Sequence, residues 1–296
     1  MRPFERLVIG CLVVAVVFVS AFWYLDRRPG SMTRMQALGL PGGLLGIDEP
    51  VAAAAEPEGT EAAATVGLPL PLTSRPTRIV WAGDSLAGSL AAAVTAQGAV
   101  RGVEIVGRTT PGCGMVRGLP TDAAMSPVPW AAACDESVGP HVASVSALGA
   151  DVVTWLSTWE TANRIVDGQG YEFGTPEADA MLLALIDESA RQLTAGGARL
   201  VLLTVAPNTT APGRPERDPA AEQRARHLNA LLRRYAAAHP DRVAVLDLAA
   251  MVCPTGPPCP AQVDGHTLRP EDGAHFAGSG PAWVAQRVFD HLLGPA

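Results

Sequence analysis

Three residues of this chain, one in its first third and two near its C-terminus, have the types and spacing needed for nucleophilic acyl chemistry. Ser85 stands just after a short apolar run, residues 78–82, where a strand would deliver it to the end of a sheet. A serine hydroxyl is a weak nucleophile unless a base lies within hydrogen-bond reach. His275 can supply that base, and Asp272, three residues before it, can hold the imidazole through Nδ1. We therefore predict a triad of Ser85, Asp272 and His275 in that chain order.

The remaining histidines are weaker candidates for the base. His266, with Asp264 two residues before it, is the main competitor. The others fall in helical or surface patterns and receive a structural interpretation: His141, His227, His239 and His291.

The elements that must position the triad alternate between short β-branched runs and longer amphipathic ones. This alternation predicts a three-layer α/β domain with a parallel sheet of about five strands. Ligands of such sheets bind at the carboxyl ends of the strands, where Ser85 is expected. We predict strands at residues 78–82, 103–106, 151–156, 200–205 and 243–246, and helices at 86–97, 141–148, 176–195, 220–239 and 279–293.

An uncharged apolar run near the N-terminus predicts a membrane segment. Residues 7–25 have about the length that a bilayer core requires. The run continues past a loose signal-peptidase pattern at residues 19–21 into aromatic residues, which favours an uncleaved anchor over a secretory signal peptide. The flanking arginines weakly favour an inside N-terminus, so the rest of the chain is expected outside the membrane, or secreted if the segment is cleaved.

Three regions follow from these patterns. Residues 1–28 are the predicted membrane anchor, and residues 77–296 the predicted globular domain. Between them, residues 29–76 are rich in Gly, Pro and Ala without a sustained period, which is typical of a flexible linker.

Charge and composition exclude one class of partner. The 296 residues are 48% hydrophobic, which is enough for a sizeable core, and carry a formal net charge of -7. Proteins that bind a phosphate backbone concentrate Lys and Arg on one face. No such basic cluster is found in the sequence, so we predict no nucleic-acid partner.

Four cysteines lie in predicted loops of the globular domain. An even number outside the cytoplasm favours two disulfides. Three pairings are possible, and the local ones, Cys113 with Cys134 and Cys253 with Cys259, require the least chain crossing. A zinc site is the competing interpretation, but no Cys-x-x-Cys pair is present, and we predict neither a metal nor another cofactor.

Two motifs carry a resemblance to a known family. Gly83-Asp84-Ser85-Leu86 after the first strand and Asp272-Gly273-Ala274-His275 before the last helix resemble the SGNH (GDSL) hydrolase superfamily. The resemblance covers residue 77 to the C-terminus. It implies a flavodoxin-like fold and acyl-ester chemistry, with Ser85 as nucleophile, His275 as base and Asp272 as the residue that orients the base.

The family pattern also implies donors that stabilise a tetrahedral oxyanion. They are the serine amide, a glycine after the second strand and an asparagine after the third. Gly112 is the favoured glycine, with Gly114 as the alternative. At the asparagine position this chain has Trp159, whose indole N–H can donate a hydrogen bond to the oxyanion. Alternatively, Asn163 can turn inward and supply this donor. Trp159 can equally be a wall of the substrate cleft.

This departure resembles SGNH domains fused to membrane O-acyltransferases of bacterial envelope polysaccharides, which often carry a Cys pair before the last helix. Residues 246–259, with Cys253 and Cys259, look similar, and Asp247 there is interpreted as a loop cap. The resemblance implies a membrane-anchored, extracytoplasmic serine esterase or O-acyltransferase. Its substrate would be an acylated glycan, plausibly O-acetylated, or a small ester, and a membrane acyltransferase would be a separate chain.

Two other interpretations remain. An α/β-hydrolase would need Gly-x-Ser-x-Gly, but Ala87 stands where the second glycine belongs. A catalytically inactive binding or scaffold protein of the cell envelope is favoured by the missing asparagine. The presence of Ser85, Asp272 and His275 counts against that scaffold.

Overall fold

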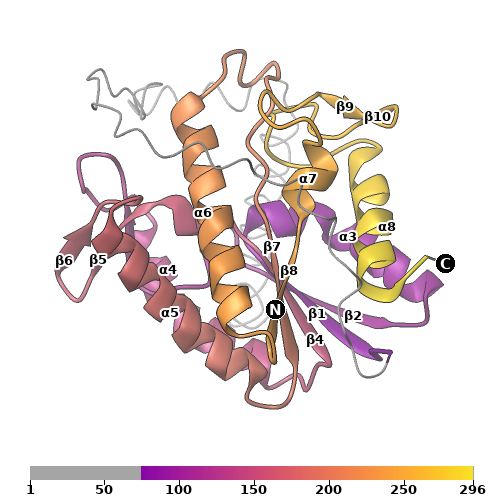
Figure 1. Cartoon of the computed structure of the whole chain (residues 1–296), viewed down its shortest axis with the longest axis horizontal. Coiled ribbons are helices and arrows are strands. Elements are labelled where there is room, and N and C mark those ends of the chain that lie inside the picture. Colours follow the sequence, from indigo (N-terminus) through magenta and orange to yellow (C-terminus); the bar gives the residue numbers. More distant parts are fainter. Residues whose placement is uncertain (1–74, 296) are drawn as a thin grey trace, which may run out of the picture. The chain divides into compact units, whose positions relative to one another are not determined.

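The computed structural model describes residues 75–295, which form an α/β fold around one parallel sheet (Figure 1). The sheet order is β2-β1-β4-β7-β8, and every neighbouring pair is parallel. This is the doubly wound, flavodoxin-like order, in which the first strand lies inside the sheet. The strands are β1 (Arg78–Gly83), β2 (Glu104–Thr109), β4 (Val152–Leu156), β7 (Arg199–Leu203) and β8 (Val243–Leu246).

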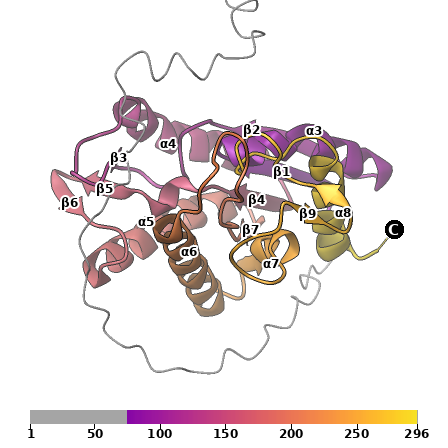
Figure 2. The same cartoon turned by 90° about the horizontal axis from the view of Figure 1, so that it is seen from above.

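Helices cover both faces of this sheet, so that strand residues are buried on both sides (Figure 2). On β1, Ile79 and Trp81 join the core under one helical layer, whereas Val80 and Ala82 join the core under the other. The first layer contains α3 (Ser85–Val100), α7 (Leu248–Val252) and α8 (Gly280–Leu293). The second contains α4 (Ala131–Ser146), α5 (Pro176–Thr194) and α6 (Pro219–Ala238).

The predicted α/β fold with a five-stranded parallel sheet is confirmed, and most boundaries agree within a few residues. The start of α4 is the exception, because the helix begins at Ala131 and not at residue 141. Pro140 lies inside it on the exposed side. Burial of an apolar stripe with spacings of three and four residues stabilises the helix by more than the hydrogen bond lost at this proline destabilises it. The stripe consists of Ala131, Cys134, Val138, Val142 and Val145.

Short elements beside the main sheet were not predicted. A second sheet pairs β3 (Leu119–Thr121), β5 (Asn163–Val166) and β6 (Gln169–Tyr171) in antiparallel fashion. A two-stranded hairpin joins β9 (Gln262–Val263) and β10 (His266–Thr267). Strands of two to four residues are too short to show a period in the sequence.

The predicted membrane anchor at residues 1–28 and nearly all of the predicted linker at residues 29–76 lie outside the described residues. Among residues 75–295, no helix has both the length and the apolar character needed to cross a membrane.

Candidate active site

Ser85 is the first residue of α3 and follows a tight turn at the end of β1. The turn requires glycine at position 83, whose φ is +143°, and a Cβ there would lie 1.9 Å from the carbonyl oxygen of Leu156. Asp84 caps the helix, because its Oδ1 accepts a hydrogen bond from the Leu86 amide at 2.7 Å. The serine is therefore presented at the carboxyl end of β1 by backbone geometry that the Gly-Asp-Ser sequence dictates.

Asp84 also connects this turn to the loop after β4. Its side chain is fully buried, and Oδ2 accepts hydrogen bonds from the amide of Thr158 at 2.8 Å and from its hydroxyl at 3.0 Å. A buried carboxylate requires such partners, since an unpaired one is costly. The loop that follows β4 is thus fixed to the serine turn.

The structure brings Ser85, His275 and Asp272 together. Nε2 of His275 lies 2.8 Å from Oγ of Ser85, and Nδ1 lies 2.6 Å from Oδ2 of Asp272. With the proton on Nδ1, the imidazole donates to the carboxylate and accepts from the serine hydroxyl. These distances fit a nucleophile, a base and an orienting acid.

Asp272 is held in its charged form. Burial alone would raise its pKa, but hydrogen bonds from the His275 ring and from two backbone amides lower the pKa below its ordinary value. The amides are those of Ala274 and His275, which donate to Oδ1 at 2.8 Å and 2.9 Å. The carboxylate can therefore orient the imidazole and stabilise its protonated form.

The loop that carries Asp272 and His275 rests on the loop after β7. Gly273 has a φ of +74°, and a Cβ there would lie 2.0 Å from the carbonyl oxygen of Thr209. The Thr209 amide in turn donates to the Gly273 carbonyl at 2.9 Å. Buried Arg269 adds a second link, from Nη1 to the Pro207 carbonyl at 2.7 Å. Sequence reasoning missed Thr209 and Arg269, because their partners are more than 60 residues away.

The competitor His266 has no comparable arrangement. Asp264 is paired with Arg287 at 2.6 Å, and the His266 ring lies against Trp283 with a centroid distance of 6.1 Å. The structure therefore gives this histidine a packing role in β10.

Gly112 lies in the loop after β2, beside the serine turn. The Thr110 amide donates to the Gly83 carbonyl at 2.8 Å, which joins the two segments. The Gly112 carbonyl accepts from Nε1 of Trp130 at 3.2 Å. Within residues 75–295 the Gly112 amide makes no hydrogen bond, and its role as an oxyanion donor stays a prediction.

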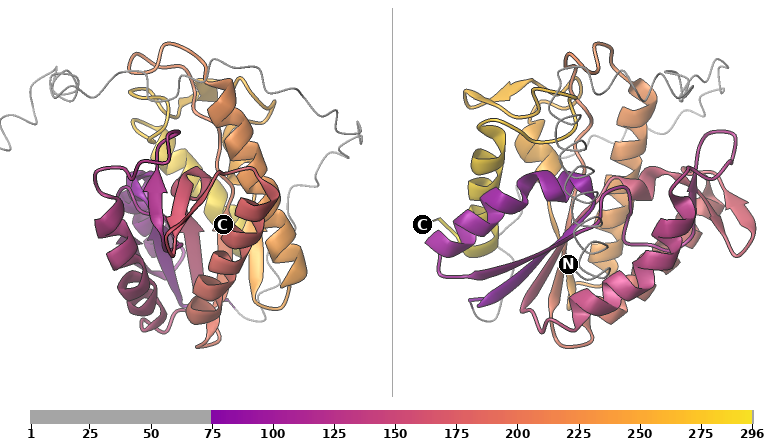
Figure 3. Two further views of the ribbon diagram at one scale, coloured as in Figure 1. Left: turned by 90° about the vertical axis from the view of Figure 1, so that its left-hand side faces the viewer. Right: turned by 180° about the vertical axis from the view of Figure 1, so that it is seen from behind.

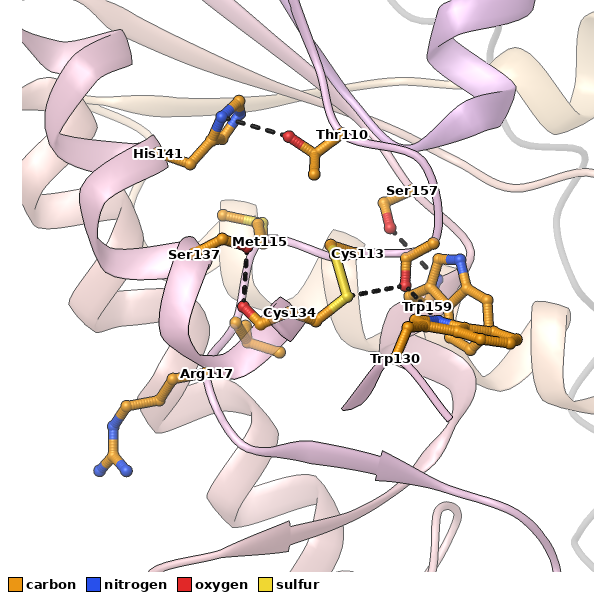
Figure 4. Close-up of a disulfide and its surroundings, with 12 residues drawn as sticks. Thr110, Cys113, Met115, Arg117, Trp130, Cys134, Ser137, His141, Ser157 and Trp159 are labelled. Atoms are coloured by element: carbon orange, nitrogen blue, oxygen red, sulfur yellow. Dashed lines mark hydrogen bonds between the residues drawn. A yellow bond between two sulfur atoms is a disulfide. The ribbon is translucent and has the colours of Figure 1, made fainter. Parts of the chain in front are cut away.

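The two alternative donors after β4 are placed differently. Trp159 begins a 3-10 turn, Trp159–Thr161, and its ring packs edge-on against Trp130 at 5.5 Å (Figure 4). Asn163 is buried at the start of β5, and its amide oxygen accepts from the Phe173 amide and from Arg224. The side chain of Asn163 is thus hydrogen-bonded to the segment after β6 and to α6, and its alternative role as an oxyanion donor stays a prediction.

Both local cysteine pairs form disulfides. Cys113–Cys134 joins the Gly112 loop to α4, and Cys253–Cys259 closes a short loop after α7 (Figure 4 shows the first). The competing zinc site is therefore absent at these cysteines. Asp247 caps α7 by accepting from the Ala250 amide, in agreement with the predicted capping role.

One family model matches most of this chain. The family model described as "SGNH domain (fused to AT3 domains)" matches residues 56–289, beginning inside the predicted linker. Among curated proteins, none matches the chain.

Several solved structures have a similar fold. One is the lipopolysaccharide acetyltransferase periplasmic domain of Salmonella ser. Paratyphi A, with 10% identity and a TM-score of 0.49, covering 74% of this chain and 84% of that one. A GDSL-like lipase from Bacteroides thetaiotaomicron VPI-5482 has 16% identity and a TM-score of 0.44, with 73% and 89% covered. The acetyl xylan esterase AlAXEase has 14% identity and a TM-score of 0.45, with 73% and 100% covered.

Proposed function

Because the chain belongs to the family of SGNH domains that occur fused to AT3 domains, an esterase and acyltransferase family, we propose that it is a membrane-anchored, extracytoplasmic serine esterase or O-acyltransferase. One observation carries the proposal: the unbroken hydrogen-bond chain from Ser85 through His275 to Asp272, with distances of 2.8 Å and 2.6 Å. The proposed substrates are acyl esters, above all O-acetyl esters, of envelope glycans.

The proposed reaction begins when Ser85 Oγ attacks the ester carbonyl carbon. Nε2 of His275 takes the hydroxyl proton, and Asp272 stabilises the resulting imidazolium. The carbonyl π electrons move to oxygen, and the oxyanion accepts hydrogen bonds from the Ser85 and Gly112 amides and the Trp159 indole. As the C–O bond to the leaving alcohol breaks, His275 returns the proton to that alcohol, which leaves an acyl-serine.

The second half of the reaction decides between hydrolysis and transfer. Water or a glycan hydroxyl attacks the acyl-serine, again losing its proton to His275, and the serine is regenerated. Both outcomes use the same side chains and differ only in the acceptor. The family's association with AT3 domains supports transfer, with a membrane acyltransferase as the proposed partner.

An aromatic pair beside Gly112 supports a sugar substrate. Trp130 is 39% exposed, although it is held in place by its hydrogen bond to Gly112 and by its edge-on contact with Trp159. A fixed, exposed indole offers an apolar face at low entropic cost, and the C–H face of a sugar ring is a suitable partner for it. We place the alcohol portion of the substrate against this pair.

Two observations support the proposed extracytoplasmic, membrane-anchored location. The two disulfides are typical of proteins outside the cytoplasm. The apolar run at residues 7–25 supplies the proposed anchor, and residues 29–76 the proposed tether to the domain at residues 77–296.

The alternative is a binding or scaffold protein with the fold but without the reaction. It is favoured by Trp159 at the expected asparagine position and by the hydrogen bonds that the Asn163 amide oxygen accepts from Phe173 and Arg224. The aligned side chains of Ser85, Asp272 and His275 favour the enzyme.

The test uses the full-length protein, an activated acetyl ester, and the variants Ser85→Ala and His275→Ala. Ser144→Ala, at an exposed helical position, and His291→Ala, at a partly exposed one, are matched controls. The proposal expects activity in the wild type and both controls and a loss of at least about 10³-fold in both triad variants. Wild-type activity no higher than that of folded Ser85→Ala would favour the scaffold. Adding an alcohol acceptor and measuring its acylated product separates transfer from hydrolysis.

A further inference from the structure

A buried glutamate contacts the loop that carries Gly112. Glu160 is 3% exposed and follows Trp159 in the turn after β4. Its Oε1 accepts a hydrogen bond from the Met115 amide at 2.5 Å, on the loop after β2. A Cβ on Gly114 would lie 2.4 Å from the same oxygen. The carboxyl group therefore touches the loop two residues from Gly112, in space that only a glycine at position 114 leaves open.

A buried arginine connects the same two segments. Arg164, 3% exposed, donates from Nη1 to the carbonyls of Val116 and Gly118 at 3.3 Å and 3.0 Å, and from Nη2 to the Trp159 carbonyl at 3.0 Å. Together, Glu160 and Arg164 bind one amide and several carbonyls of the Gly112 loop, and both belong to the segment that starts with Trp159. No residue of the triad takes part in these contacts.

These contacts matter because an oxyanion site requires its donors to be fixed before the reaction. The Gly112 amide is on one side of the contact and the Trp159 indole on the other. We propose that Glu160 is a positioning residue that fixes the Gly112 loop and the Trp159 turn relative to each other, and so preorganises the oxyanion site. This inference rests on the proposed nucleophilic role of Ser85.

The contact does not require a charge on Glu160. Burial, with a smaller contribution from Asp84, raises the pKa of its carboxyl group by more than the Met115 amide, the Ser157 hydroxyl and the charge of Arg164 lower it. Within the described part of the chain, Oε2 has no hydrogen-bond partner, which favours the neutral acid at this buried position. Glutamine preserves the shape and the acceptor for Met115, whereas aspartate is one methylene too short and leucine has no acceptor.

The experiment compares the full-length variants Glu160→Gln, Glu160→Asp and Glu160→Leu with the wild type. We expect kcat to fall by on the order of 10²-fold in the Asp and Leu variants, with KM within about 2-fold, because an oxyanion donor acts mainly in the transition state. Glu160→Gln should stay within about 3-fold of the wild type. Glu222→Gln, at another buried glutamate that pairs with Arg217, is the matched control and should leave kcat unchanged.

Gly114→Ala tests the same contact from the loop side if a Glu160 variant does not fold. Its Cβ must displace the carboxyl group, so we expect the loss of kcat seen in Glu160→Asp. Gly139→Ala, on an open face of α4, is its control. An unchanged kcat in folded Gly114→Ala or Glu160→Leu would overturn the proposal, and so would a Gln variant as impaired as the Leu variant.

Hydrogen exchange separates failure of this inference from failure of the proposed function, since it needs no turnover. Exchange of the Met115 amide should accelerate in Glu160→Leu and remain slow in Glu160→Gln. If the wild type has no more esterase activity than Ser85→Ala, the proposed function fails even if exchange behaves as expected. If activity is present but exchange at Met115 is unchanged in Glu160→Leu, only the role of Glu160 is refuted.

Discussion

Asp84 binds Thr158 through both the amide and the hydroxyl of the threonine, at 2.8 Å and 3.0 Å. This pair connects the turn that presents the proposed nucleophile with the turn that carries Trp159. Because β1 and β4 are neighbours in the sheet, their carboxyl ends meet, and one buried carboxylate can hold both turns. The placement of the nucleophile and of one proposed oxyanion donor thus depends on the same side chain.

Removing the charge of Asp272 should impair catalysis without unfolding the protein. In Asp272→Asn, the amide group can donate to Nδ1 and so favour the imidazole tautomer that cannot accept the serine proton. We expect kcat to fall on the order of 10³- to 10⁴-fold. Steady-state kinetics with an activated acetyl ester measure the loss, and Asp241→Asn, at an exposed position, is the control. Retention of a tenth of the activity would argue against the proposed role of Asp272.

Gly273 should not tolerate a side chain. Gly273→Ala combines a positive φ, which costs about 1–2 kcal/mol, with a Cβ only 2.0 Å from the Thr209 carbonyl oxygen. We expect lower stability and displaced Asp272 and His275, and hence a large loss of kcat. Gly256→Ala has a similar φ of +71° but no atom within 4 Å of the added Cβ, so it isolates the conformational cost. Equal melting temperatures and activities of the two variants would contradict the prediction.

The two disulfides should differ in their effect on activity. Removing Cys113–Cys134, which closes a separation of 21 residues, should cost about 3 kcal/mol, and removing Cys253–Cys259, with a separation of 6, about 2 kcal/mol. Only the first holds the Gly112 loop, so only the double Ala variant of Cys113 and Cys134 should also lower kcat. Denaturant unfolding and kinetics below the unfolding transition measure the two effects. A loss of kcat confined to the Cys253 and Cys259 variant would refute this assignment.

Mild acid should destabilise the domain through His141. Burial lowers the pKa of this residue below the ordinary 6.5, and Arg108 lowers it further. Well above pH 6.5, the His141 ring is neutral in both the folded and the unfolded state. As the pH falls below 6.5, the unfolded chain binds the proton first, so the free energy of unfolding decreases.

Denaturant unfolding between pH 7.5 and pH 5 checks this prediction. His141→Gln should flatten the decline in unfolding free energy, and His291→Gln, at a partly exposed position, should not. Identical pH dependence in the wild type and His141→Gln would show that another group is responsible.

Trp130 should affect glycan esters more than small esters. Trp130→Ala removes the exposed face against which we place the sugar, so KM for an O-acetylated oligosaccharide should rise by about 10-fold. The KM for a small activated acetyl ester should change by less than about 3-fold, because this ester lacks the sugar that we place against the indole. A parallel rise for both substrates would indicate that Trp130 acts only by supporting Gly112. Trp283→Ala, on α8 against His266, is a control for loss of an indole elsewhere.

The sequence predicted those features that depend on residues close together in the chain. Alternation of apolar runs predicted the five-stranded sheet, and the position of Gly83-Asp84-Ser85 directly after the first run predicted that the serine lies at the end of a strand. Glu160 and Arg164 could not be found in this way. Their partners lie 45 to 48 residues earlier in the chain, and only the folded sheet brings the segments together. The triad, although its side chains are aligned, remains a prediction until the variants are assayed.

The Ser85–His275 contact joins residues that are 190 positions apart. Helix α3, which begins with Ser85, packs beside α8, which follows the loop that carries His275 (Figure 3). During synthesis, Ser85 leaves the ribosome long before α8 does, and the sheet can form while the serine still has no base. Non-local contacts of this kind form late in folding. Ser85 therefore meets its proposed base only late in folding, when the segment that carries His275 has docked.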